Sequence, residues 1–248
     1  MIRRTLLILG LLLACAGPGL AQTFVQSGYC GSISSGGTCV YGMNTTATNT
    51  NLIFLSLPAV ATSITVTDSH NTYTQLSSTN CTGNSLITVF EADNIFGGAD
   101  TITVSWTGGA ATDVIYSEYS GLAASAFDKT SCGHATSTAA SSGSTSTTSF
   151  ANELVVGFGS SCCTTWSAAL INGSSTGVNV RTNNVNASYE ALWDKNVTST
   201  GAQIAAATDG AVTQYSLFVA TFKASSQPGG AASTIGGPSR VGGPTRTD

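Results

Sequence analysis

Hydrophobic residues along this chain alternate with hydroxyl and amide residues, or form short runs that end at Gly, Pro or Asn. Ser63–Thr67 sets Ile64 and Val66 between Ser and Thr residues, and Leu52–Leu57 is an almost continuous apolar run closed by Pro58. A period of two is typical of a half-buried strand, and a short apolar run between turn residues is typical of a buried strand. No segment keeps a helical period, and β-branched residues predominate. The sequence therefore predicts an all-β protein, an antiparallel β-sandwich of the jelly-roll or immunoglobulin-like class.

One segment has a counterpart later in the chain. Ser85–Trp106 predicts two strands joined by a short connection, and Ser188–Thr208 repeats its spacing of apolar, Asn and Gly positions. Further matches at the same offset join Asn51–Phe54 to Asn152–Val155, Phe90 and Asn94 to Leu192 and Asn196, and Val114–Ser117 to Ser216–Val219. We therefore expect one sandwich built from two similar halves.

The remaining segments are assigned from turn residues and apolar spacing. Thr23–Tyr41 predicts a first strand pair around Cys30 and Cys39, and Asp68–Asn71 predicts a turn because Asp and Asn bond their own backbone. Ser131–Ser149 is low in complexity and is expected to be a long loop between the halves, with room for one edge strand. Further strands are expected at Asp113–Tyr119, Glu153–Gly159, Gly177–Thr182, Ala187–Trp193, Ala202–Thr208 and Gln214–Lys223.

Both ends of the chain differ in composition from the expected sandwich, 22–224. Residues 1–21 have the positive, apolar and small-residue regions of a secretory signal, with cleavage after Ala21. The alternative is lipoprotein processing at Cys15, which would leave a lipid anchor. Residues 225–248 are rich in Gly, Pro, Ser and Thr, so we expect a disordered tail. The tail holds a tandem hexapeptide, which is either part of a flexible segment or a docking tag for a partner.

Composition limits the classes of partner. Only 8% of residues are charged and the net charge is −4, so the chain lacks the basic patch that nucleic-acid binding needs. Hydrophobic content of 42% is ample for a core, and no later run is apolar enough to span a membrane. The surface must consist of Ser, Thr, Asn and Gly. Such a surface suits an extracellular protein that meets glycans or copies of itself, although it is also common in secreted β-proteins without a ligand.

Several segments together resemble a family of secreted bacterial β-sandwich domains. They are Val66–Tyr73, Glu118–Leu122, Ala151–Gly157 and Leu217–Lys223. Domains of this kind are found in adhesins, immunoglobulin-like arrays and extracellular hydrolases. The resemblance covers about Asn51 to Lys223 and implies a fold and a compartment, but no catalytic residues. The extra cysteines and the segment around Cys30 depart from the family.

Six cysteines remain after removal of the signal, which in an exported chain favours disulfides. They are Cys30, Cys39, Cys81, Cys132, Cys162 and Cys163. Cys30 and Cys39 are the simplest pair, because they are close in sequence across a turn. The other four allow two solutions: Cys81–Cys132 with a bridge between the adjacent cysteines, or each adjacent cysteine joined to one of the other two. No Cys-x-x-Cys pair or neighbouring His favours a metal site.

Few residues could carry catalysis. His70 follows Asp68 and Ser69, but neighbours in one turn cannot reach triad geometry, so we interpret the run as a structural turn. His134 is expected to be a solvated side chain in the Ser/Thr loop. Glu91 and Glu190 lie in corresponding halves, and a facing pair would suit glycoside hydrolysis. Strand carboxylates more often bond backbone amides at sheet edges.

Binding chemistry has two sets of candidates. Loop oxygens that could hold Ca²⁺ belong to Asp68, Asn71, Asp93, Asn94 and Asp100, without a known motif to organise them. No other cofactor is expected. Trp166, Trp193 and Tyr73 are the candidates for an aromatic platform on which a sugar ring could stack, and Trp166 is the one expected to be exposed. Most aromatic residues in such a chain belong to the core.

Three functions are consistent with these features. The first is a secreted, non-catalytic β-sandwich that binds a carbohydrate or another surface polymer, as in adhesion. The second is a structural subunit of an extracellular fibre or matrix, since few charges protect the strand edges from pairing. The third is an extracellular glycoside hydrolase. The sequence favours a protein without catalytic activity.

Overall fold

The computed structural model describes residues 22–33, 38–76, 81–82, 85–109, 111–183 and 189–225, and this part of the chain is built from strands. The signal, Cys15 and residues 226–248 of the expected tail lie outside the described residues. Within the described part, no helix is long and apolar enough to cross a membrane. The strands are β1 (Thr23–Ile33), β2 (Thr38–Thr45), β3 (Thr50–Leu57), β4 (Thr62–Thr67), β5 (Thr74–Gln75), β6 (Cys81–Thr82), β7 (Leu86–Ala92), β8 (Gly98–Thr107), β9 (Ala111–Ser120), β10 (Leu122–Ser141), β11 (Asn152–Ser161), β12 (Trp166–Ile171), β13 (Asn179–Asn183), β14 (Glu190–Thr198) and β15 (Ala205–Ala224).

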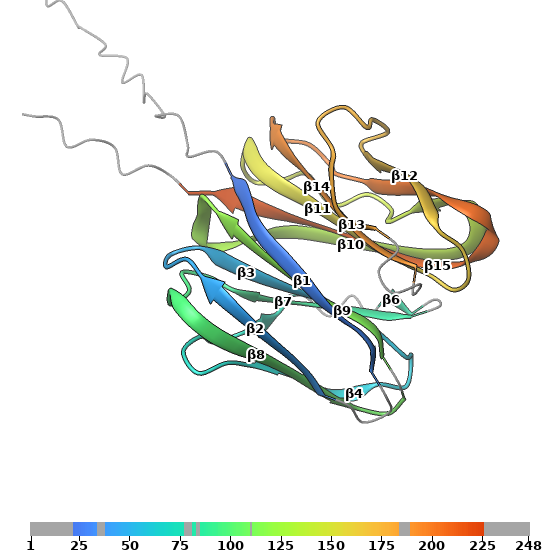
Figure 1. Ribbon diagram of the computed structural model, residues 1–248. Coiled ribbons are helices and arrows are strands. Elements are labelled where there is room, and N and C mark those ends of the chain that lie inside the picture. Colours follow the sequence, from blue (N-terminus) through green and yellow to red (C-terminus); the bar gives the residue numbers. More distant parts are fainter. Residues whose placement is uncertain are drawn as a thin grey trace, which may run out of the picture.

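The strands form three antiparallel sheets. Sheet A has the order β1-β9-β3-β7-β5, with β6 added to β7, and sheet B has the order β2-β8-β4. Sheet C has the order β10-β15-β11-β14-β13, with β12 added to β15. Figure 1 shows sheet A between the other two, with β2, β8 and β4 on one side and the strands of sheet C on the other. The predicted all-β sandwich class is confirmed.

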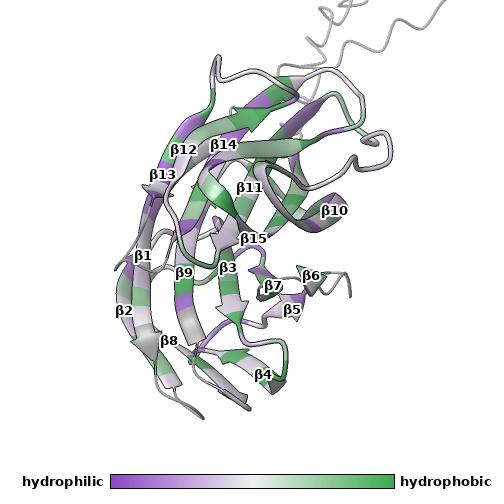
Figure 2. Ribbon diagram, turned by 90° about the vertical axis from the view of Figure 1, so that its right-hand side faces the viewer, coloured by the Kyte–Doolittle hydropathy of each residue, from purple (hydrophilic) through white to green (hydrophobic). Residues whose placement is uncertain are grey.

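The centre of sheet A is buried on both faces, because each face contributes to a different core. Every residue of β3 is buried. Ile53 and Leu55 face sheet B, where they meet Val104 and Trp106 of β8. Phe54 and its neighbours Leu52, Val89 and Ile115 face sheet C, where they meet Leu154, Val156, Phe158 and Phe222. A third core lies on the far face of sheet C and includes Trp166, Trp193 and Leu217. Figure 2 shows this stacking from the side, with hydrophobic positions, in green, along strands of all three sheets.

The two halves share one strand order. β1, β9, β3, β7 and β5 correspond in sequence to β10, β15, β11, β14 and β13. In the second half, β10 and β15 are each one long strand of 20 residues. The residue-by-residue match from the sequence is wrong, however. Ile53 faces sheet B whereas its expected partner Leu154 faces the contact between the halves, because an odd shift along a strand reverses the face of each side chain.

Other expectations need correction as well. β1 and β2 do not pair with each other, since β1 joins β9 in sheet A and β2 joins β8 in sheet B. Much of the expected Ser131–Ser149 loop is strand β10, which pairs with β15 over most of its length. This strand has little apolar alternation, because it lies at a sheet edge and is held mainly by its backbone hydrogen bonds to β15. The two strands expected at Ala202–Thr208 and Gln214–Lys223 are one strand, β15, and β12 was not expected.

The cysteines adopt the first of the two predicted solutions. Cys30 is paired with Cys39, Cys81 with Cys132, and Cys162 with Cys163. The first disulfide joins β1 of sheet A to β2 of sheet B, and the second joins β6 of sheet A to β10 of sheet C. Disulfides of this kind are typical of an oxidising, extracellular environment.

Candidate binding site

The three predicted platform residues do not form an exposed platform. Trp166 is 5% exposed and donates from Nε1 to the carbonyl of Tyr189 at 2.6 Å. Trp193 is fully buried in the core on the far face of sheet C, where its ring packs on Gly157 and its Nε1 donates to the carbonyl of Leu170 on β12. Tyr73 is half-buried, and its hydroxyl donates a hydrogen bond to Asp68 Oδ2. The prediction of an exposed Trp166 is therefore wrong.

An exposed pair of aromatic rings lies elsewhere, on the connection between β7 and β8. Phe96 is 56% exposed, and the His70 ring stacks on it with centroids 4.4 Å apart and planes inclined by 16°. His70 is the structural turn residue that the sequence predicts, and no sequence pattern marks Phe96. A Phe in a connection between strands is weak evidence for a binding site in a sequence, because it contributes to a site only when the fold places a second ring against it.

The backbone under this pair is fixed by hydrogen bonds. The Phe96 amide donates to Asn71 Oδ1 at 2.8 Å, and its carbonyl accepts from Thr45 Oγ1 at 2.8 Å. The neighbouring Ile95 exchanges two backbone hydrogen bonds with the Thr48–Asn49 turn, each 3.0 Å long. Phe96 is therefore held at the surface by its backbone, with its ring free for contact.

The turn that carries His70 is organised by Asp68, as predicted. Asp68 Oδ1 accepts the backbone amides of His70 and Asn71, at 2.8 and 2.6 Å. Asp68 Oδ2 accepts from Asn71 Nδ2 at 2.7 Å and from the Tyr73 hydroxyl at 3.0 Å. Burial raises the pKa of Asp68, but these hydrogen bonds outweigh it and lower the pKa below its usual value. An ionised Asp68 therefore holds the turn rigid.

A hollow of about 620 Å³ opens beside His70 on the outer surface of sheet B. It is lined by Gly42, Met43, Asn44, Ser69, His70, Ala99, Asp100 and Thr101. Nothing lies near the position that a Gly42 Cβ would take, so the strand surface there is open. Asn44, Ser69 and Thr101 are exposed and offer amide and hydroxyl groups. The Asp100 carboxylate lies 3.8 Å from His70 Nδ1 at the floor of the hollow.

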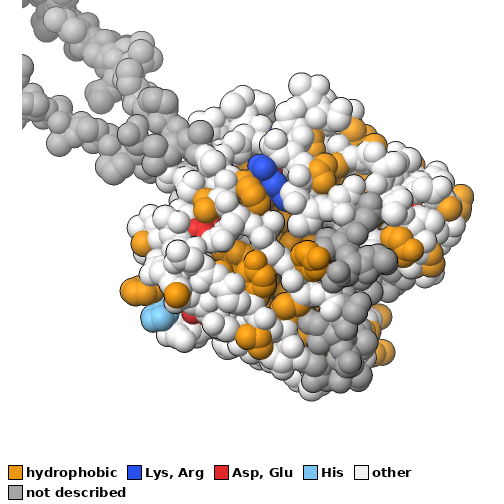
Figure 3. Space-filling view, in the orientation of Figure 1, with side chains coloured by type: hydrophobic (Ala, Val, Ile, Leu, Met, Phe, Trp, Pro, Cys, Tyr) orange, Lys and Arg blue, Asp and Glu red, His pale blue; other side chains and the backbone are white. Residues whose placement is uncertain are grey.

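This arrangement combines two features that polar cyclic ligands need. The stacked rings give a flat apolar surface, and the hollow gives donors and acceptors at its side. Its volume lies in the range of small-molecule sites, roughly 300–1,000 Å³. Figure 3 shows only scattered charged side chains on the face that it draws, among hydrophobic and uncharged ones. The surface is therefore suited to a ligand with many hydroxyl groups.

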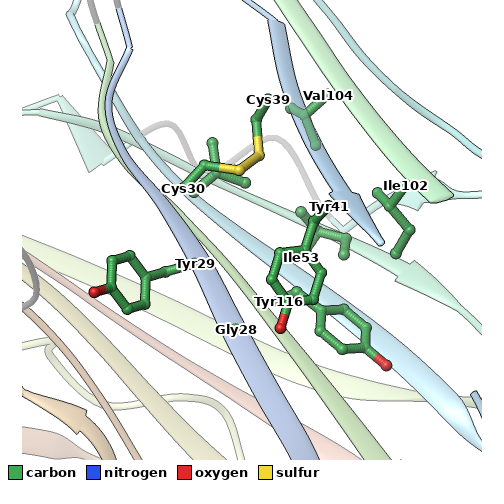
Figure 4. A pocket seen from close by; sticks show the side chains of 10 residues that line it. Gly28, Tyr29, Cys30, Cys39, Tyr41, Ile53, Ile102, Val104 and Tyr116 are labelled. Atoms are coloured by element: carbon green, nitrogen blue, oxygen red, sulfur yellow. A yellow bond between two sulfur atoms is a disulfide. The ribbon is translucent and has the colours of Figure 1, made fainter. Parts of the chain in front are cut away.

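A second cavity between β1 and β2 is too small for such a ligand. Its volume is about 10 Å³, which is room for one water molecule at most. Tyr41 and Tyr116 lie on one side of β1, with ring centroids 5.8 Å apart, and Tyr29 points away on the other side (Figure 4). Gly28 lets the Tyr41 ring cross the strand, since a Cβ there would lie 2.0 Å from the ring. We interpret this region as packing.

The proposed Ca²⁺ ligands fall into two groups. Asp68, Asn71 and Asp100 are joined, because Asn71 Nδ2 donates to both carboxylates. Asp93 lies apart, where it accepts from Thr50 Oγ1 at 3.0 Å. Within the described part of the chain, no cluster of three or more His, Cys, Asp or Glu residues could hold a metal ion. Calcium binding stays a prediction.

The expected catalytic pair is not formed. The carboxyl next to Glu91 is Asp93, whereas the carboxyl next to Glu190 is Asp113. Burial, followed by the neighbouring carboxyl, raises the pKa of each glutamate to about 8. Both are buried, so a substrate could not reach them in this structure. His134 is exposed as expected, but it lies on strand β10 and not in a loop.

Comparison of the chain with family models, with curated proteins and with solved structures gives no match.

Proposed function

We propose that this protein is a secreted, non-catalytic carbohydrate-binding module whose site is the His70–Phe96 pair with the adjoining hollow. The observation that carries the proposal is the stacked pair on a rigid turn, beside exposed amide and hydroxyl groups. A sugar ring has an apolar C–H face that packs on an aromatic ring and a rim of hydroxyls that needs hydrogen-bond partners. The site supplies both, and rigid backbone lowers the entropic cost of binding.

The charges of the hollow narrow the class of glycan. Asp100 is its carboxylate, and the residues that line it include neither Lys nor Arg. A uronate or sulfate group would therefore meet a like charge without a cation to balance it. Neutral polysaccharides fit the site better than acidic ones, and extracellular polymers of bacteria and plants include many of this class.

A pull-down with insoluble neutral polysaccharides tests the proposal. We expect the wild-type chain to sediment with at least one of cellulose, chitin, xylan or β-glucan. Phe96→Ala should lose about two- to tenfold in affinity, since an aromatic contact contributes about 0.5–1.5 kcal/mol. Phe150→Ala is a matched control, because Phe150 is also exposed, at 51%. It lies on the connection between β10 and β11 of sheet C, whereas the hollow lies on sheet B. Binding that survives Phe96→Ala unchanged would place the glycan elsewhere.

The alternative of a structural subunit has one observation in its favour. Val25 and Tyr29 on β1, and Val40 on β2, are 41%, 44% and 59% exposed. Both strands lie at the edges of their sheets among the described residues, where a second chain could pair. Sedimentation velocity over a concentration series distinguishes the two functions: growth into polymers supports a fibre, and a constant monomer supports the binding module.

A further inference from the structure

Sheets A and C meet through a buried polar cluster at one end of their apolar contact. We call this cluster the serine–carboxyl seam; its members are Ser56, Ser85, Asp113, Ser160, Glu190 and Ser216, all buried. The first three belong to the half with sheet A and the last three to sheet C. Ser160 Oγ lies 3.0 Å from Ser56 Oγ and 3.0 Å from Ser85 Oγ, and it donates to Glu190 Oε1 at 3.0 Å.

Two carboxyl groups meet across this seam. Asp113 on β9 and Glu190 on β14 are both fully buried. The serines place them close together, because Asp113 lies opposite Ser56 in the β3–β9 pairing, Ser56 donates to Ser160, and Ser160 donates to Glu190. Two carboxyls can form a hydrogen bond only when one carries a proton, because an ionised carboxylate has no hydrogen to donate. Two buried negative charges in this place would repel each other with little solvent screening.

A second carboxyl pair lies at the opposite end of the contact. Glu91 on β7 and Asp93 are two residues apart and act on each other through their charges, and Asp93 accepts the backbone amide of Ala126 from the second half at 3.2 Å. Lys223 acts on Glu91 through its charge, and Asp93 also accepts from Thr50. Phe54 and Phe158 pack between the two ends, with ring centroids 5.4 Å apart. The contact between the halves thus has a shared-proton pair at each end.

We propose that these two carboxyl pairs make the contact between the halves a pH-sensitive joint, which is tight in acid and loosens as the medium becomes alkaline. The step is a deprotonation: the proton shared by each pair passes to solvent, and no other bond is broken. The charges on Asp113 and Glu190 then repel each other across the joint, whereas those on Glu91 and Asp93 repel each other within the first half, where it meets β10. The protein is on this basis built for an acidic extracellular medium.

The direction of the effect follows from linkage. The pKa of Glu91 and of Glu190 is about 8 in the folded chain, against 4.5 for an ordinary glutamate. The folded state therefore binds more protons than the unfolded state between these values. The stability that the pairs contribute is fully present below pH 4.5 and is lost as the pH rises toward 8.

Proton release on unfolding tests the joint directly. The oxidised mature chain is unfolded by urea in weakly buffered solution at pH 6.5, and the released protons are titrated. We expect Glu190→Gln to release about one proton fewer than the wild-type chain, because Gln cannot take part in proton sharing but keeps the shape and a donor for Asp113. Glu91→Gln should show the same loss at the other end of the joint.

Glu118→Gln is the matched control. Glu118 is as deeply buried, but its partners are the donors Gln26, Thr46, Asn49 and Tyr116 and not a second carboxyl. The infrared C=O band of a protonated carboxyl gives a readout that does not depend on unfolding. We expect this band at pH 6.5 in the wild-type chain and in Glu118→Gln, and a weaker band in Glu190→Gln. An unchanged proton count and an unchanged band in Glu190→Gln would overturn the proposal.

Discussion

The ring of Phe54 on β3 lies 5.4 Å from the ring of Phe158 on β11, so one aromatic contact joins the centres of the two halves. Both side chains are fully buried. Phe54→Ala should lower the free energy of unfolding by about 3–5 kcal/mol, because it removes a large apolar side chain and leaves a cavity in the contact between sheets. Urea unfolding at pH 5 measures the loss. Phe150→Ala, at the surface, should change the stability by less than about 0.5 kcal/mol.

Two glycines should differ in how well they tolerate a methyl group. A Cβ on Gly157 would lie 2.6 Å from the Trp193 ring, and that ring is fully buried and cannot move aside. A Cβ on Gly28 would meet the end of the Tyr41 side chain, which is half-buried and can swing outward. Gly157→Ala should cost about 1–3 kcal/mol through overpacking, and Gly28→Ala less. Equal melting temperatures for the two variants would contradict this packing.

The stability lost on removal of each disulfide should increase with the length of chain that the disulfide closes. Cys81 and Cys132 are 51 residues apart and join the two halves, whereas Cys30 and Cys39 are 9 residues apart. In the chain-entropy account, loss of the first costs about 4 kcal/mol and loss of the second about 3 kcal/mol. The adjacent pair Cys162–Cys163 closes almost no loop and should matter least. Denaturant unfolding of the three double Cys→Ala variants gives the order.

At low pH, protonation of Asp128 should destabilise the protein. Asp128 is partly buried, which raises its pKa, but hydrogen bonds from the Ser149 amide and hydroxyl and from Lys129 outweigh burial and lower its pKa to about 2. The stability that it contributes is present above pH 3.8 and is lost as the pH falls toward 2. Asp128→Asn should remove part of the acid loss in a series of melting temperatures from pH 2 to 5. A variant that loses stability in acid as steeply as the wild-type chain would show that another group is responsible.

Much of the fold could be predicted from the sequence, because most strands carry an apolar signal. β3, β4 and β9 lie close to where alternation or apolar runs place them. β10 could not be predicted in full, since its Ser, Thr and Gly residues gain their strand conformation from hydrogen bonds to β15 and not from burial. The sheets to which β1 and β2 belong could not be predicted either, because the alternation of apolar and polar residues along a strand does not identify its pairing partner.

The candidate site was predicted only in part. The turn at Asp68 and the place of His70 in it follow from local Asp and Asn chemistry. The role of Phe96 depends on a ring that is 26 positions earlier in the sequence, which only the fold brings into contact. The burial of Trp166 cannot be predicted from the sequence, because it depends on the pairing of β12 with β15, which places the ring in the core on the far face of sheet C.

Chemical-shift mapping of the labelled chain with a soluble neutral oligosaccharide tests the central claim, that the His70–Phe96 pair and the hollow form the glycan site. The titration uses cello-, chito- and xylo-oligosaccharides at pH 5. We predict saturable shifts that are concentrated at Phe96, His70, Asn44 and Thr101, and that are lost in Phe96→Ala. Saturable shifts confined to other surfaces, or none with any neutral oligosaccharide, would contradict the account.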